Sequence, residues 1–138
     1  RSERFDTSVL GLKVTHKRPG QMVFMSAGGD SSHELALIRV AADAPGPEPT
    51  RVGLYHFAWE MESFEDLQQL YNEMHEQGVR IGGLGDHGIS MGVYFFDPEQ
   101  NRVEIYFATG FGMADLDGRR IGIQIGERIK AADNQRSH

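Results

Sequence analysis

The order of predicted elements is repeated on either side of a proline-rich segment, and this repeat constrains the fold more than any other feature. Proline lacks the backbone N–H that a sheet ladder needs, so the segment Ala44-Pro45-Gly46-Pro47-Glu48-Pro49 is not expected to be a strand. Residues 44–51 are therefore interpreted as a linker. The stretches before and after it each predict one helix followed by three strands. Such a repeat favours paired modules over an irregular mixture of helices and strands.

The first module, residues 1–43, has the pattern α-β-β-β. Phe5, Val9 and Leu10 recur at helical spacing before Gly11, which predicts a helix from Ser2 to Leu10. Glycine-containing turns then separate three predicted strands, at Leu12–Thr15, Met22–Met25 and Glu34–Val40. The strand that would lead this module is absent from the chain.

The second module, residues 52–109, has the full pattern β-α-β-β-β. A strand at Leu54–Trp59 leads to Ser63, a predicted N-cap, and to a helix from Phe64 to about Gln77. Its apolar stripe is formed by Phe64, Leu67, Leu70, Tyr71 and Met74. The remaining strands are expected at Ile89–Met91, Val93–Phe96 and Arg102–Phe107, with a hairpin loop at 97–101. The sequence predicts one α+β domain over residues 1–138, with residues 110–138 as a tail.

Composition excludes several classes of function. The net charge of −6 and pI of about 5.4 provide no basic patch for nucleic acid or anionic lipid. No apolar run approaches the ~20 residues that a membrane span needs, so neither a nucleic acid nor a membrane is an expected partner. Cysteine is absent, which leaves His, Asp and Glu as metal ligands. We expect a cytoplasmic protein.

Two polar residues lie at the centre of apolar runs. His56 lies within Gly53–Trp59, and Glu104 lies within Arg102–Phe107. A carboxylate or an imidazole in such a place is costly unless it is paired, and a divalent metal would pair both at once. The alternative is a buried His–Glu hydrogen-bonded pair without a metal.

Strand alternation predicts which side chains share a face with each ligand candidate. His56 is expected on the face of Leu54 and Ala58, while Tyr55, Phe57 and Trp59 point toward the helix. Glu104 is expected on the face of Arg102 and Tyr106, while Val103, Ile105 and Phe107 face the core.

The motifs in residues 2–107 resemble the vicinal-oxygen-chelate superfamily, and within it type I extradiol ring-cleaving dioxygenases. The resemblance rests on Tyr55-His56-Phe57-Ala58-Trp59, Phe64-Glu65-Asp66-Leu67, Asp86-His87-Gly88, Val93-Tyr94-Phe95-Phe96-Asp97-Pro98 and Asn101-Arg102-Val103-Glu104-Ile105. It implies paired βαβββ modules that form a cupped mixed sheet with a metal in the cup. Gln100 stands where the family usually has glycine, so slight strain is expected in that turn.

The resemblance implies that His56 and Glu104 are metal ligands. Non-haem Fe(II) oxygenases use two histidines and one carboxylate, so Fe(II) is the expected cofactor and Mn(II) the alternative. The family's other histidine comes from the leading strand of the first module, which we expect to precede Arg1. His16, beside Lys17 and Arg18, is interpreted as a solvated turn residue.

Three further residues match catalytic groups of the ring-cleaving enzymes. His33 matches an acid–base group beside the O₂ site, and His87 and Tyr94 match groups that orient the substrate and assist its deprotonation. Each has a structural alternative: a surface histidine after a Ser-Ser turn, a loop histidine and a core tyrosine. The interval of seven residues between His87 and Tyr94 is shorter than in some relatives.

The resemblance therefore implies an extradiol dioxygenase that cleaves a catechol-like aromatic diol with O₂. Two alternatives share the fold, namely a glyoxalase-like lyase or isomerase that uses a metal, and a metal-free protein that binds a small planar molecule. His33, His87 and Tyr94 favour the dioxygenase. A homo-oligomer is expected.

Overall fold

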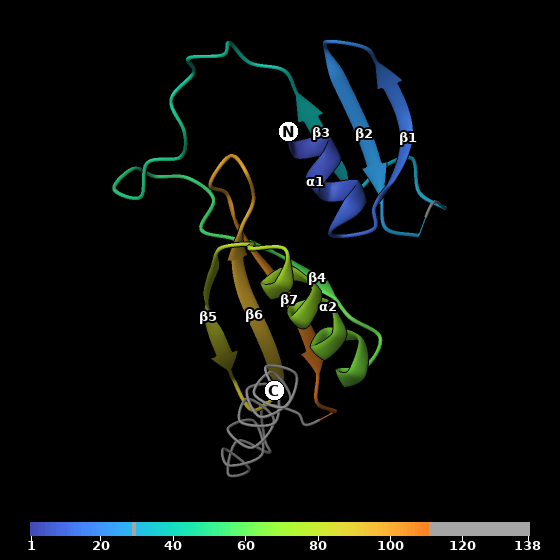
Figure 1. The fold of residues 1–138 in the computed structure, drawn as a ribbon, viewed down its shortest axis with the longest axis vertical. Helices are drawn as coiled ribbons and strands as arrows, with labels where there is room; N and C mark the ends of the chain where they lie inside the picture. Colours follow the sequence, from blue (N-terminus) through green and yellow to red (C-terminus); the bar gives the residue numbers. More distant parts are fainter. Residues whose placement is uncertain (29, 111–138) are drawn as a thin grey trace. The chain divides into compact units, whose positions relative to one another are not determined.

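Residues 1–28 and 30–110 are described by the structure, a computed structural model. They form two compact units, residues 1–52 with 97–100, and residues 53–96 with 101–110. Two helices and seven strands follow one another as α1-β1-β2-β3 and then β4-α2-β5-β6-β7 (Figure 1). The predicted α+β class and the βαβββ module are confirmed. The predicted tail lies almost entirely outside the described residues.

The first unit is a helix and an antiparallel sheet. Helix α1 spans Ser2–Ser8, and the strands β1 (Lys13–Arg18), β2 (Met22–Ser26) and β3 (Leu35–Ile38) pair in that order. Val23 and Met25 of β2 are buried, while β1 is exposed along its whole length.

Several boundaries in the first unit differ from the prediction, and β3, for example, spans Leu35–Ile38 rather than Glu34–Val40. The helix ends at Ser8 rather than Leu10. Strand β1 continues to Arg18, so His16 lies within a strand and not in a turn. The reason is the register with β2, in which Arg18 pairs with Met22 and the chain reverses at Gly20, whose φ is +74°. The pattern of residues within β1 alone does not reveal which strand pairs with it.

The second unit is a complete βαβββ module. Helix α2 (Phe64–Glu76) connects β4 (Phe57–Glu60) to β5 (Ile81–Asp86), and β6 (Ser90–Phe96) and β7 (Arg102–Ala108) follow. The sheet order is β4-β7-β6-β5, with β4 parallel to β7 and the other pairs antiparallel. The sheet is therefore mixed, as predicted. The described strands form two sheets, and the joining of both modules around one cup stays a prediction.

Helix α2 has the predicted start and end. The Ser63 hydroxyl accepts a hydrogen bond from the Asp66 amide at 3.1 Å, which satisfies one of the free N–H groups of the first turn. Gly78 follows the helix at a φ of +72°, which favours glycine. Phe64, Leu67, Tyr71 and Met74 are buried, and Leu70 is half-buried. The helix covers one face of the sheet, where the ring of Phe64 lies 6.4 Å from that of Phe107 (Figure 1).

The strands after α2 differ from the prediction. The two strands predicted at Ile89–Met91 and Val93–Phe96 are one continuous strand, β6, which begins at Ser90. Strand β5 was not predicted, because its sequence Ile-Gly-Gly-Leu-Gly-Asp is rich in a residue that weakens strands. The folded chain explains why glycine occupies these positions. A Cβ at Gly82 would lie 2.9 Å from the ring of Phe96, and one at Gly85 would lie 2.7 Å from the ring of Tyr94.

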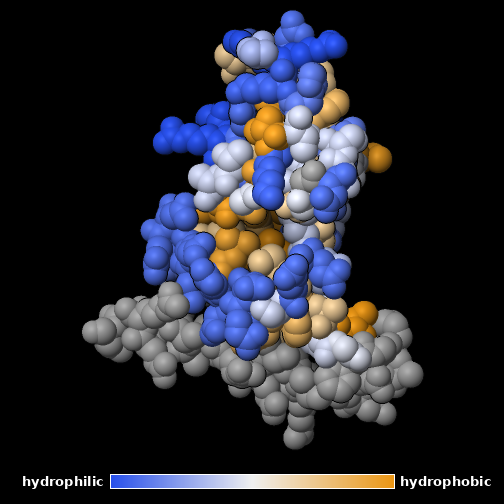
Figure 2. Space-filling view, turned by 90° about the vertical axis from the view of Figure 1, so that its right-hand side faces the viewer, coloured by the Kyte–Doolittle hydropathy of each residue, from blue (hydrophilic) through white to orange (hydrophobic). Residues whose placement is uncertain are grey.

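Hydrophilic side chains cover most of the described surface in Figure 2, and hydrophobic side chains are exposed in smaller areas between them. No helix within residues 1–28 and 30–110 has the length and apolar character needed to cross a membrane.

Candidate functional site

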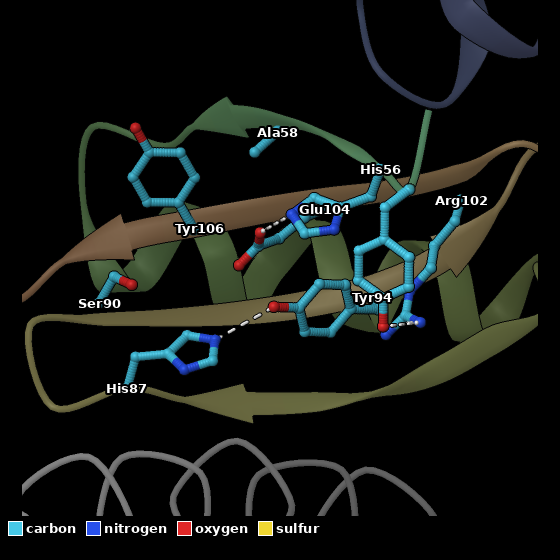
Figure 3. A pocket seen from close by; sticks show the side chains of 9 residues that line it. His56, Ala58, His87, Ser90, Tyr94, Arg102, Glu104 and Tyr106 are labelled. Atoms are coloured by element: carbon cyan, nitrogen blue, oxygen red, sulfur yellow. Dashed lines mark hydrogen bonds and ion pairs between the residues drawn. The ribbon is translucent and has the colours of Figure 1, made fainter. Parts of the chain in front are cut away.

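A pocket of about 580 Å³ opens on the sheet of the second unit. Glu104 points into it from β7, whereas its neighbours Val103 and Ile105 are buried on the other side of the strand. This alternation places the pocket on the face opposite α2 (Figure 3). Its lining consists of Tyr55, His56, Ala58, His87, Ser90, Tyr94, Arg102, Glu104 and Tyr106.

His56 and Glu104 lie side by side in this pocket. The Nε2 atom of His56 is 3.2 Å from the Oε2 atom of Glu104, whose side chain is only 9% exposed. The pairing of β4 with β7 explains this proximity, because Ala58 is opposite Glu104 and His56 lies two residues earlier. The two side chains therefore lie as close together as a shared metal or a direct hydrogen bond would require. Their role as ligands stays a prediction.

The two donors fit a common metal ion in part. Ligand atoms that are each about 2.1 Å from a metal and at right angles to one another lie about 3 Å apart, which is close to the separation of His56 and Glu104. The Nδ1 atom of His56 is buried and has no hydrogen-bond partner in the described chain. Within that part no group of three or more His, Asp or Glu side chains could hold a metal. The described residues thus supply an imidazole and a carboxylate but not a third ligand.

His87 and Tyr94 form a second pair in the same pocket. The Nε2 atom of His87 lies 3.1 Å from the hydroxyl of Tyr94, and the Tyr94 ring packs edge-on against His56 at 5.4 Å between centroids (Figure 3). Burial, followed by the negative charge of Glu104 and a hydrogen bond with it, raises the pKa of Tyr94, and the charge of Arg102 opposes this. The phenol therefore remains protonated at neutral pH.

Arg102 and Tyr55 complete one wall of the pocket. The Arg102 guanidinium carbon lies 4.8 Å from the ring centre of Tyr55 and 4.6 Å from that of Tyr94, and Nη1 donates a hydrogen bond to the Tyr55 hydroxyl at 2.8 Å. The prediction that Tyr55 points toward the helix was wrong. Strand β4 begins only at Phe57, so strand alternation does not apply to residue 55. Arg102 was placed on the correct face, but its stacking between two tyrosines has no sequence signal.

His33 belongs to the first unit. Its exposed ring stacks on that of Phe24, with centroids 4.2 Å apart and an angle of 19°, and Nδ1 lies 3.0 Å from the Ser32 hydroxyl. His16 lies on the neighbouring strand, with its ring 6.1 Å from Phe24. The acid–base role of His33 stays a prediction.

Comparison with known sequences identifies the family. A family model, "Glyoxalase/Bleomycin resistance protein/Dioxygenase superfamily", matches residues 1–105. A catechol-2,3-dioxygenase of Bacillus subtilis (strain 168) is 32% identical over 107 residues, which are 77% of this chain and 36% of that protein. Biphenyl-2,3-diol 1,2-dioxygenase 3 of Rhodococcus globerulus is 30% identical over 105 residues, 73% of this chain and 54% of that protein. The chain therefore spans about half or less of the length of these relatives.

Solved structures share the fold. A lactoylglutathione lyase from Agrobacterium tumefaciens aligns with a TM-score of 0.59 and 26% identity, over 80% of this chain and 87% of that one. A glyoxylase/bleomycin resistance protein/dioxygenase domain from Frankia sp. EAN1pec aligns with a TM-score of 0.63 over 78% of this chain and 86% of that one, and at 21% identity it supports the fold alone. Together with the family match, these likenesses confirm the resemblance found in the motifs: the chain belongs to the Glyoxalase/Bleomycin resistance protein/Dioxygenase superfamily.

Proposed function

We propose that this protein is an extradiol dioxygenase that opens the ring of a catechol-like aromatic diol with O₂. The observation that carries the proposal is the meeting of two pairs in one pocket, His56 with Glu104 at 3.2 Å and His87 with Tyr94 at 3.1 Å. The curated relatives are named as dioxygenases of catechol and biphenyl-2,3-diol, which supports an aromatic diol as the proposed substrate class.

His56 and Glu104 would hold Fe(II), with Mn(II) as the alternative, in a site completed by a further ligand. Bound there, the metal would supply the redox chemistry that lets O₂ react with the aromatic ring. The buried Glu104 carboxylate would gain a counter-charge in this arrangement, because its ion-pair partner His56 is charged only when protonated.

Tyr94 and His87 would handle a proton of the diol. The Tyr94 hydroxyl would take the proton that the diol loses and pass its own hydroxyl proton to Nε2 of His87, which lies 3.1 Å away. The phenol, whose pKa is raised, would thus stay neutral, and the imidazole of His87 would carry the added proton. His33 is proposed to act as the acid–base group that donates a proton to the oxygen atoms supplied by O₂. The tyrosine rings and Arg102 would form a flat wall for the planar substrate.

The test is O₂ uptake by Fe(II)-loaded protein with catechol and 2,3-dihydroxybiphenyl, together with the absorbance of the ring-opened product. Glu104→Gln should lose most bound metal and activity, because the neutral amide is a poor ligand for a hard cation. The matched control is Glu60→Gln on β4, an exposed position outside the pocket lining. Tight metal binding without O₂ uptake would contradict the dioxygenase and favour a lyase or isomerase, whereas binding of planar molecules without metal would favour a resistance-type protein.

A further inference from the structure

Two glycines are paired on adjacent strands of the sheet beneath the pocket. Gly85 of β5 and Gly92 of β6 are directly opposite in the antiparallel register, and Tyr106 of β7 is the next residue in the same row. Side chains in a cross-strand row project to the same face, and Tyr106 lines the pocket. Residues larger than glycine at 85 and 92 would therefore project into the pocket.

The space above Gly92 is taken by Glu104. Glu104 pairs with Tyr94 in the register, so its side chain leans diagonally over Gly92. A Cβ at position 92 would lie 2.9 Å from Cδ and 3.1 Å from Cγ of Glu104, and closer still to Oε1. The Glu104 carboxylate can thus lie beside His56 only because residue 92 has no side chain.

The space above Gly85 is taken by the other functional pair. A Cβ at position 85 would lie 2.7 Å from Cε2 and 3.3 Å from the hydroxyl of Tyr94, and 3.3 Å from Nε2 of His87. The two glycines therefore make one hollow that is filled from β7 by Glu104 and from β6 by Tyr94.

We infer that Gly92 and Gly85 are positioning residues, the first for the carboxylate of Glu104 and the second for the hydrogen-bonded pair of Tyr94 and His87. The meaning of this placement for catalysis rests on the proposed function. Neither glycine has a positive φ, so alanine suits the backbone at both positions. The atoms that an added Cβ meets belong to side chains, so the functional groups move and the sheet remains.

Three alanine substitutions test the inference. Gly92→Ala should weaken binding of Mn(II), used alone in calorimetric titration, by about tenfold or more, the size seen when a ligand loses its orientation. Gly85→Ala should leave Mn(II) affinity within about twofold while lowering diol turnover of the Fe(II)-loaded protein by about tenfold or more, because misplaced catalytic groups lose rate steeply. The matched control is Gly82→Ala, whose Cβ would lie 2.9 Å from Phe96, a ring that does not line the pocket. It should change neither property by more than about twofold.

A double-substitution cycle separates positioning from general damage. In the Glu104→Asp background the side chain is one carbon shorter and overlaps less with a Cβ at residue 92, so the loss of affinity caused by Gly92→Ala should shrink. An equal loss in both backgrounds, an unchanged affinity in Gly92→Ala, or an equal defect in Gly82→Ala would overturn the inference.

A failure of the proposed function can be distinguished from a failure of the positioning inference. If the unmodified protein binds no metal and consumes no O₂, the proposed function is wrong, and a crystal structure of Gly92→Ala still decides the positioning. We expect the separation of His56 Nε2 and Glu104 Oε2 to exceed the 3.2 Å of the unmodified protein. An unchanged separation would overturn the inference for Gly92.

Discussion

The imidazole of His87 reaches the hydroxyl of Tyr94, with 3.1 Å between Nε2 and the phenolic oxygen. The β5–β6 hairpin produces this contact, because His87 lies at its turn and its amide donates to the Ser90 carbonyl at 3.0 Å. Tyr94 lies further along β6, and its ring leans back across the hairpin over Gly85. The short interval of seven residues is therefore compatible with a working pair.

Removal of the Tyr94 hydroxyl should separate chemistry from metal binding. Tyr94→Phe keeps the ring against His56 and Arg102 but removes the group that His87 contacts, so turnover should fall by roughly 10²-fold with unchanged metal content. Tyr106→Phe is the control, because its phenol lines the same pocket but interacts with Glu60. The measurement is O₂ uptake with parallel metal analysis. Equal activity of Tyr94→Phe and the unmodified protein would remove Tyr94 from the mechanism.

The proposed role of His33 can be tested against a neighbouring histidine. His33→Ala should lower turnover by roughly 10²-fold or more, the effect of losing a positioned acid–base group, and should leave bound metal unchanged. His16→Ala is the control, since both rings lie near Phe24 and both residues are exposed. Loss of metal from His33→Ala would show that the acid–base role is wrong.

Asp6 should make the stability of the protein depend on pH. Burial, and then the charge of Asp97, raise the pKa of Asp6 from 3.8 to about 6. The folded state thus holds this proton more tightly than the unfolded chain does. The resulting stabilisation is complete below pH 3.8 and is lost as the pH rises through 6.

Asp6→Asn should therefore raise the free energy of unfolding at pH 7.5 by about 1–2 kcal/mol, given about 1.4 kcal/mol per pKa unit and some relaxation around the charge. The substitution should also reduce the fall in the free energy of unfolding between about pH 4 and 7. Urea unfolding across this range provides the measurement, with the exposed Asp43→Asn as control. A decline that persists unchanged in Asp6→Asn would show that another group causes it.

Gln100 should be a site of backbone strain. Among the described non-glycine residues it alone has a positive φ, at 69°, as expected from its place in a hairpin where the family usually has glycine. Gln100→Gly should raise the free energy of unfolding by about 0.5–1 kcal/mol, because a side chain is disfavoured in this conformation. Gln77→Gly is the matched control, since Gln77 has a φ of −82° and gains only unfolded-state entropy from the change. In thermal unfolding, the midpoint temperature should rise in Gln100→Gly and fall in Gln77→Gly.

The sequence determined the helices, most strands and the identity of the ligand candidates, because these depend on local patterns. Ser63 and Gly78 bound α2 through capping chemistry that acts within a few residues. His56 and Glu104 were identifiable because polar groups in apolar strands require partners. The motifs also indicated the superfamily without any structure.

Tertiary structure decided what depends on partners distant in the chain. Strand β5 exists despite its glycines because Phe96 and Tyr94 of β6 fill the space above Gly82 and Gly85. Tyr55 lines the pocket because Arg102, 47 residues later in the chain, binds its hydroxyl and stacks on its ring. Neither relationship is encoded in local periodicity, since each arises only when strands pair and their side chains compete for the same volume.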